Sequence, residues 1–99
     1  MSVFSKRLRE ARLRAGLTQE GLGVLAGIDE MTASPRMNQY EKGKHEPDFS
    51  MVERIAKALK LPAPYFYTAD DQAAELLLGF HRLKKSDKAK LLQALSEML

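Results

Sequence analysis

The sequence predicts an all-α protein, and two observations support that prediction. Apolar residues recur at helical spacing along most of the chain, and no segment alternates apolar and polar residues as a half-buried strand does. The expected helices are separated by typical helix-end residues, with Ser, Thr or Asp at their starts and Gly at several stops. The 99 residues, 44% of them hydrophobic and 29% charged, suffice for one small domain with an appendage.

The first two expected helices each end at a glycine. The first covers residues 2–15 and ends at Gly16, which suits a left-handed stop. Thr18 is the N-cap of a second helix of under three turns that ends at Gly27. Gly23 lies inside this helix, where glycine costs about 1 kcal/mol relative to alanine. We therefore expect a neighbouring segment to need room there.

A gap in the helical pattern is expected between the end of the second helix at Gly27 and the start of the third. The helical pattern lapses over residues 29–33, and Ser34 then acts as an N-cap with Pro35 at the first helical position. This helix runs from Pro35 to about Lys42 and ends at Gly43.

A fourth helix follows Asp48, its expected N-cap, and carries a continuous apolar stripe. We assign the stripe to the core. Prolines then break the helix, and the aromatic residues 65–67 form one further turn that packs on the bundle as a lid. The stripe consists of Phe49, Val52, Ile55, Ala56 and Leu59.

The last third of the chain predicts a helical hairpin. Its helices are expected over residues 72–84 and 87–98, with Ser86 capping the second. Two helices alone cannot bury two apolar stripes, so the hairpin docks either on residues 1–68 or on another chain. The apolar residues to be covered are Leu76, Leu77, Phe80, Leu91, Leu92 and Leu95.

Positive charge is concentrated near the start of the chain. The net charge is +3, and the whole excess lies in residues 1–61, with 11 Lys and Arg against 8 Asp and Glu. The cations are densest in the first expected helix, and this basic run is a candidate surface for binding a polyanion. The alternative interpretation is an ordinary solvated helix face. The cations of the first helix are Lys6, Arg7, Arg9, Arg12 and Arg14.

Several classes of site are absent from the composition. There is no cysteine, so a disulfide framework, a thiolate zinc site and a cysteine nucleophile are excluded. The two histidines are far apart in sequence, and no metal-ligand spacing, phosphate-binding glycine loop or catalytic trio is present. We expect no catalytic residues, no metal and no cofactor. The sequence has neither a membrane-spanning stretch nor a signal-peptide core, so we expect a cytoplasmic protein without a membrane partner.

An ordered set of motifs is similar to the lambda-repressor-like helix-turn-helix family of regulators. Leu17-Thr18-Gln19-Glu20 opens the second helix, Gly27-Ile28 ends it, and Tyr40-Glu41-Lys42-Gly43 closes the third. The similarity spans about residues 4–67. It implies an all-α, five-helix DNA-binding bundle over residues 1–68, leaving residues 69–99 as a C-terminal hairpin. One departure concerns spacing: nine residues separate Gly27 from Met37, against about six in the family. We therefore expect a longer turn over residues 29–33, which either bulges out or reaches the DNA backbone.

The resemblance also assigns roles to single residues. It implies a structural ion pair between Arg12 and Glu41. Base edges would be read in the major groove from the exposed face of the third helix, with a phosphate contact as the alternative for Arg36 and a backbone contact for Asn38. The expected base-reading residues are Ser34, Pro35, Arg36, Asn38 and Gln39. The expected phosphate-binding residues are Thr18, Gln19, Lys42, Lys44 and His45, with a solvated loop residue as the alternative for His45.

These observations predict a sequence-specific regulator of transcription, a repressor by analogy with the family, that binds double-stranded DNA. We expect a homodimer formed through the hairpin, because one recognition helix reads only a few base pairs. No small-molecule effector is evident from the sequence. The alternative function is a protein-interaction module or an antitoxin-type partner built on the same fold.

Overall fold

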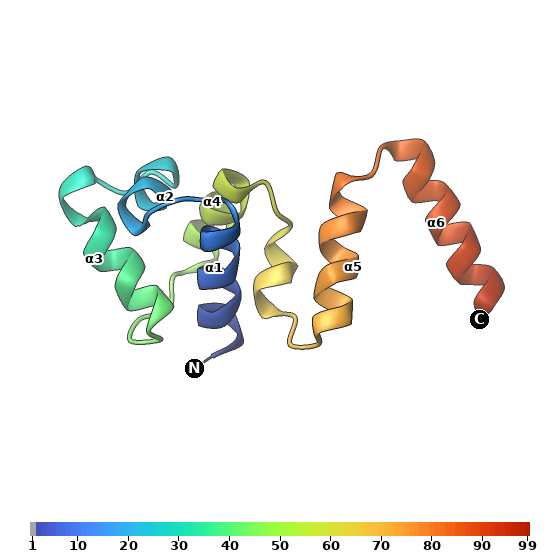
Figure 1. The fold of residues 1–99 in the computed structure, drawn as a ribbon, viewed down its shortest axis with the longest axis horizontal. Coiled ribbons are helices and arrows are strands. Elements are labelled where there is room, and N and C mark those ends of the chain that lie inside the picture. Colours follow the sequence, from blue (N-terminus) through green and yellow to red (C-terminus); the bar gives the residue numbers. More distant parts are fainter. Residues whose placement is uncertain (1) are drawn as a thin grey trace.

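In a computed structural model, residues 2–99 are described, and they form helices without any strand (Figure 1). The all-α prediction is therefore confirmed for this part of the chain. The elements are α1 (Val3–Arg14), α2 (Gln19–Leu25), α3 (Glu30–Glu41), α4 (Phe49–Leu59), the 3₁₀-helix η1 (Ala63–Tyr67), α5 (Asp71–Arg82) and α6 (Lys85–Met98).

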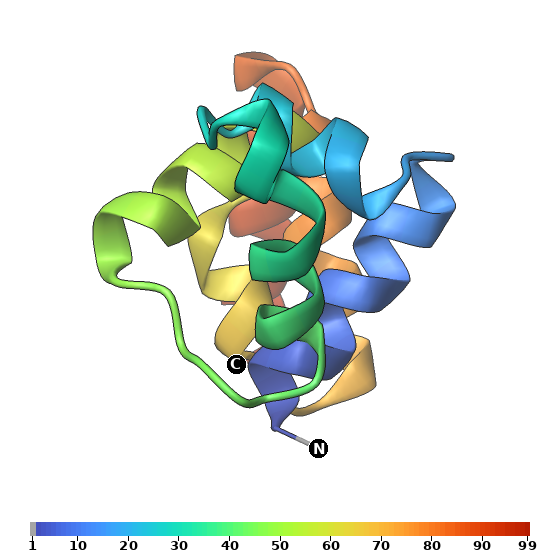
Figure 2. The ribbon, with the colours of Figure 1, turned by 90° about the vertical axis from the view of Figure 1, so that its left-hand side faces the viewer.

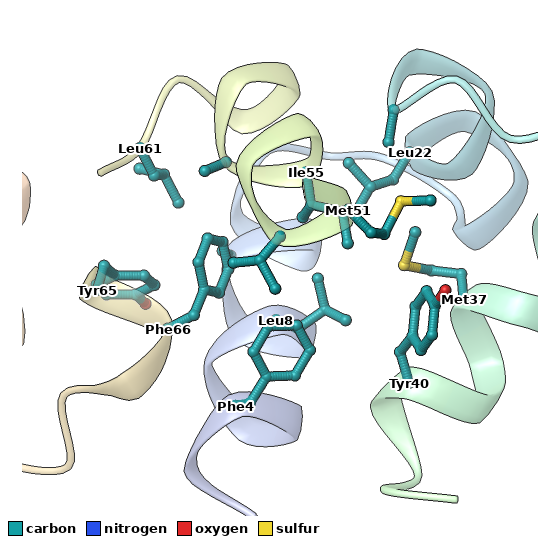
Figure 3. Packing of buried hydrophobic residues seen from close by; sticks show 14 of the residues in the cluster. Phe4, Leu8, Leu22, Met37, Tyr40, Met51, Ile55, Leu61, Tyr65 and Phe66 are labelled. Carbon is teal, nitrogen blue, oxygen red and sulfur yellow. The ribbon is translucent and has the colours of Figure 1, made fainter. Parts of the chain in front are cut away.

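One hydrophobic core joins α1, α2, α3, α4 and η1 (Figure 3). Leu8 of α1 and Val52 of α4 are fully buried, and so is Phe66 of η1. The ring of Phe66 lies 5.6 Å from that of Phe4, between centroids. The expected aromatic lid is thus present, although only Tyr65 and Phe66 are buried and the third aromatic residue is exposed. Figure 2 shows α3 and α4 from the side, joined by the long loop that follows α3.

The helix boundaries confirm several sequence predictions. The Thr18 hydroxyl accepts a hydrogen bond from the Gly21 amide at 2.9 Å and caps α2. The Asp48 carboxylate caps α4 by accepting from the Met51 amide at 2.8 Å. Gly16 has a φ of +71°, the left-handed conformation expected after the first helix.

The predicted start of the third helix is wrong by more than one turn. α3 begins at Glu30, and the Asp29 carboxylate caps it by accepting from the Met31 amide at 3.0 Å. The cause is long-range packing: Ala33 is fully buried and extends the inward-facing row of Met37 by one turn. The expected loop over residues 29–33 is therefore mostly helix. The unusual spacing reflects an extra helical turn, and the connection from α2 to α3 is only residues 26–29.

Pro35 consequently lies inside α3 instead of at its first position. A proline there has no amide to donate to the carbonyl four residues earlier, which belongs to Met31. Met31 is 85% exposed, so water can reach its surroundings. This exposure explains how the helix tolerates an internal proline.

Two smaller predictions are also wrong. Phe49 was assigned to the core stripe of the fourth helix, but it is 64% exposed, whereas Met51 is 4% exposed. Phe49 is the first residue of α4 and lies at the edge of the bundle, while Met51 faces inward. Ser86 does not cap the last helix, because α6 begins at Lys85 without a side-chain cap.

The C-terminal hairpin is open. α5 contributes one fully covered residue, Ala74, which packs at the edge of the core, whereas α6 contributes none. Figure 1 shows α6 diverging from α5 and lying far from α1 to α4. The molecule is accordingly elongated, with extents of 50 × 25 × 23 Å. Docking of α6 on residues 1–68, one of the two expected alternatives, is not seen.

Candidate nucleic-acid interface

Helices α2 and α3 pack against each other unusually closely. A Cβ at Gly23 would lie 2.7 Å from the Cβ of Ala33 and 3.1 Å from its carbonyl oxygen. Only glycine permits this approach, which explains its presence within so short a helix. The prediction that a neighbouring segment needs room at Gly23 is confirmed. Gly27, with a φ of +90°, then turns the chain toward α3.

A buried ion pair ties α1 to the end of α3. The Arg12 Nε and Nη2 atoms donate to the two carboxylate oxygens of Glu41 at 2.6 and 3.0 Å. Arg12 Nη1 also donates to the Leu17 carbonyl at 2.9 Å, which fixes the start of the α1–α2 connection. The hydrogen bond to Glu41 raises the Arg12 pKa more than burial lowers it. This pair is the one expected from the family resemblance, and its place in the interior makes it a structural element.

A shallow pocket of about 300 Å³ lies beside this ion pair, where three helices meet. The Gln19 amide donates to Asn38 Oδ1 at 3.2 Å and to Glu41 Oε1 at 3.3 Å. Arg9 and Lys42 line the same pocket, both are exposed, and neither forms an ion pair with a residue that the structure describes. Two expected phosphate-binding residues, Gln19 and Lys42, are thus brought together.

Arg9 is the residue of this pocket that sequence reasoning did not single out. It belongs to the basic run of α1, and its charge alone does not distinguish it from the neighbouring cations. The signal available was its position three residues before Arg12, which places both on the side of α1 facing the end of α3.

The other expected phosphate-binding residues lie elsewhere. The Thr18 hydroxyl caps α2, as described, and does not line this pocket. Lys44 and His45 are exposed in the loop after α3. Their backbone amides both donate to the Gln39 carbonyl, at 3.0 and 3.4 Å, which folds the loop back on the end of the helix.

The expected base-reading residues all lie on α3, but in its middle and second half. Pro35 and Arg36 are exposed, whereas Ser34, Asn38 and Gln39 are half-buried. Arg36 Nη2 donates to the Tyr40 hydroxyl at 2.9 Å, so the guanidinium group is directed along the helix toward its C-terminal end.

Sequence reasoning missed the exposed residues at the true start of α3. Met31 and Thr32 both lie in the first turn and point to solvent. Asp29, a strong N-cap residue eight positions before Met37, was the signal that could have located them. The dipeptide Ser34-Pro35 offered an equally good local start and obscured it.

The cations of α1 do not form one surface, which corrects the candidate polyanion-binding face. Arg7 is only 5% exposed and points away from α3, donating to the Thr68 and Ala69 carbonyls at 2.9 and 3.0 Å. It also pairs with Asp71 at 3.0 Å. Burial lowers the Arg7 pKa, but the hydrogen bond and charge of Asp71 outweigh it, so the pKa is raised overall. Arg7 and Arg12 are thus structural, and Arg9 is the one cation of the run that lines the pocket beside α3 without an ion pair among the described residues.

Residues 2–99 contain no group of three or more acidic or histidine side chains that could hold a metal ion. None of their helices is both long and apolar enough to cross a membrane.

Comparisons with known proteins agree with this geometry. A family model described as a helix-turn-helix domain matches residues 3–64. The crystal structure of the transcriptional regulator BswR is similar to this chain with a TM-score of 0.88 and 40% sequence identity, over 98% of this chain and 94% of that one. A search of curated proteins finds no significant match. The chain therefore belongs to the helix-turn-helix family of lambda-repressor-like transcriptional regulators, and it is not an enzyme.

Proposed function

We propose that this protein binds double-stranded DNA sequence-specifically as a homodimer and acts as a repressor of transcription. The observation that carries the proposal is the pocket in which Arg9, Gln19 and Lys42 converge beside α3. Two unpaired cations and an amide at the edge of a recognition helix suit a DNA phosphate, and such contacts fix how a protein sits on the duplex. A bound dimer represses by occupying the DNA that polymerase needs.

Base reading is assigned to α3. Its first turn enters the major groove most deeply, so Met31 and Thr32 join the expected readers, with Met31 suited to a thymine methyl group. Pro35 lies one turn further along and is equally exposed. Gln39 retains its proposed role of pairing with adenine, and Arg36 can reach guanine or a phosphate after leaving Tyr40.

Dimerisation is assigned to the hairpin. The inner faces of α5 and α6 form a groove of about 230 Å³, and its lining is entirely the apolar set predicted from the sequence. Leu92 is 54% exposed and Leu76 equally so, which leaves an apolar surface without a cover inside this chain. A second copy offers the same surface in return, as a two-fold interface requires. Two recognition helices then reach half-sites about one helical turn, ~34 Å, apart.

The first experiment is selection of bound sites from random duplex DNA, followed by a salt titration on the best site. Each phosphate contact contributes a slope of about −0.9 to a log-log plot of affinity against salt, so binding should weaken steeply between ~50 and ~200 mM. If no sequence is enriched and the affinity does not change with salt, the DNA-binding proposal is contradicted and the protein-interaction module remains as the alternative function.

Paired variants then test the assigned roles. Gln39→Ala should relax the preference at one position of each half-site by roughly 1–3 kcal/mol, because a base contact is lost. Arg9→Ala and Lys44→Ala should weaken all sequences alike and lower the salt slope by about one per half-site, because a phosphate contact carries no sequence information. Lys90→Ala, on the distant α6, is the matched control. A change of base preference in Lys44→Ala but not in Gln39→Ala would show that α3 is docked differently.

A further inference from the structure

A second, larger cleft lies on the opposite side of α1 from the DNA-facing pocket. It measures about 670 Å³ and separates α1 from α5, within the range usual for small-molecule sites. Arg7 closes its floor through its bonds to Asp71 and to the carbonyls before α5. Tyr65 and Leu78 contribute apolar wall.

The cleft carries an excess of unpaired positive charge. Of its acids, Asp71 and Glu10 are already engaged by Arg7, at 3.0 and 3.5 Å. The side chains without an ion pair among the described residues are three cations and one acid; together with Arg7 and its two acids, the lining carries a net charge of +1. These four are Lys6, Arg14, Arg82 and Glu75.

Arg14 and Arg82 lie close together at one end of the cleft. α1 and α5 run in the same direction, and each ends with one of these arginines (Figure 1). Both side chains also line an adjoining hollow of about 90 Å³, so they share one wall. Neither donates a hydrogen bond to a carbonyl or side chain that the structure describes, and the two like charges repel unless an anion lies between them.

Gly79 keeps this end of the cleft open. It lies within α5 one turn before Arg82, and a Cβ there would meet no atom within 4 Å. No close packing requires this glycine, in contrast to Gly23. A glycine at this point leaves the backbone accessible beside the two guanidinium groups.

We propose that the cleft between α1 and α5 binds a small organic phosphate, held by Arg14 and Arg82. Guanidinium groups bind phosphate oxygens through paired, charge-assisted hydrogen bonds, and two of them can neutralise a dianion. The organic part lies over Gly79 against Leu78 and Tyr65. Because the cleft joins the helix-turn-helix region to the hairpin, an occupant fixes the angle between them and so, on the function proposed above, the spacing of the two recognition helices.

The test is a titration of the ¹⁵N-labelled full chain with phenyl phosphate at constant ionic strength, without DNA. Phenol is the neutral control. Chemical-shift changes should be largest at the amides of Arg14, Gly79 and Arg82. Arg14→Gln and Arg82→Gln should each lower the affinity about tenfold or more, because each removes a charge-assisted contact, whereas Lys90→Gln, which removes the same charge on α6, should leave it unchanged.

Gly79→Leu provides a second variant that keeps all charges. It should weaken binding by filling the cleft while leaving the circular dichroism spectrum unchanged, because no atom obstructs the new side chain. Absence of saturable binding, equal weakening by Lys90→Gln, or shifts confined to Arg9, Gln19 and Lys42 would overturn the proposal. The last result would place phosphate in the DNA-facing pocket and so support the proposed function while refuting this site.

Discussion

Residues 2–68 and the α5–α6 hairpin bury their apolar residues to very different extents. Every fully buried apolar residue except Ala74 belongs to the first region, where no buried side-chain nitrogen or oxygen among the described residues lacks a hydrogen bond. The hairpin has an apolar groove open to solvent and a last helix without a buried residue. The first region is complete as a folded unit, whereas the second still has an apolar face to cover.

This contrast separates two roles. A DNA-reading unit must hold its helices rigidly, and the core and the Arg12–Glu41 pair provide that rigidity. An open apolar groove instead leaves apolar surface in water, and in the dimer proposed above the second copy would stabilise the hairpin by covering it. Changes in the first region should therefore act on unfolding, and changes in the hairpin on association.

The largest effect is expected from Arg12→Ala. Removing one partner of a buried ion pair leaves Glu41 uncompensated at 4% exposure, which typically costs about 3–5 kcal/mol. Urea unfolding followed by circular dichroism measures the loss. Arg9→Ala, on the same helix but exposed, should change the free energy of unfolding by less than about 0.5 kcal/mol. Equal effects of the two variants would mean that the pair is not structural.

Leu92→Lys should act on association. Leu92 is 54% exposed in one chain, so a two-fold interface that covers both copies should lose about 1.5–3 kcal/mol of dimer stability, half of what two fully buried leucines contribute. Sedimentation equilibrium measures this shift. Leu25→Lys, at another exposed leucine, is the control. A wild-type chain that remains monomeric at high concentration would contradict the proposed dimer.

Substitution by alanine at two glycines should change the free energy of unfolding in opposite directions. Gly23→Ala places a methyl group 2.7 Å from Ala33 and should destabilise the protein by about 1–3 kcal/mol, the usual cost of overpacking. Gly79→Ala meets no atom within 4 Å and should stabilise α5 by up to about 1 kcal/mol. Thermal or urea unfolding of both variants measures the difference. A stabilised Gly23→Ala would show that α2 and α3 are further apart.

The smallest effect concerns alkaline pH. Burial raises the pKa of Tyr67, at the junction of the two regions, and the charge of Glu46 raises it further. The neutral phenol is therefore favoured in the folded state, and this contribution is present below the unfolded pKa of about 10 and declines as pH rises above it. Because Tyr67 is 56% exposed, the decline should be slight. Tyr67→Phe should make the free energy of unfolding less dependent on pH between about 9 and 11. An unchanged slope in this variant would exclude Tyr67 as the cause of the pH dependence.

The sequence by itself determined the features that depend on neighbours within a turn. Thr18 and Asp48 cap their helices as predicted, because a side chain and the amide three residues later meet in any helix start. The six apolar residues of the hairpin were identified from helical spacing alone and line one groove. Family motifs added the pairing of Arg12 with Glu41, which are 29 residues apart and have no local signal.

Tertiary structure decided the features in which several local solutions compete. Asp29 and Ser34 are both good N-caps, and the burial of Ala33 close to Gly23 favours the earlier start of α3. Arg7 and Arg9 are equivalent cations in the sequence. Arg7 is nevertheless buried and donates to carbonyls more than 60 residues away, whereas Arg9 stays exposed. Local propensity differs by only about 1 kcal/mol between such alternatives, whereas burial and long-range hydrogen bonds contribute several times more, so packing determines which alternative is realised.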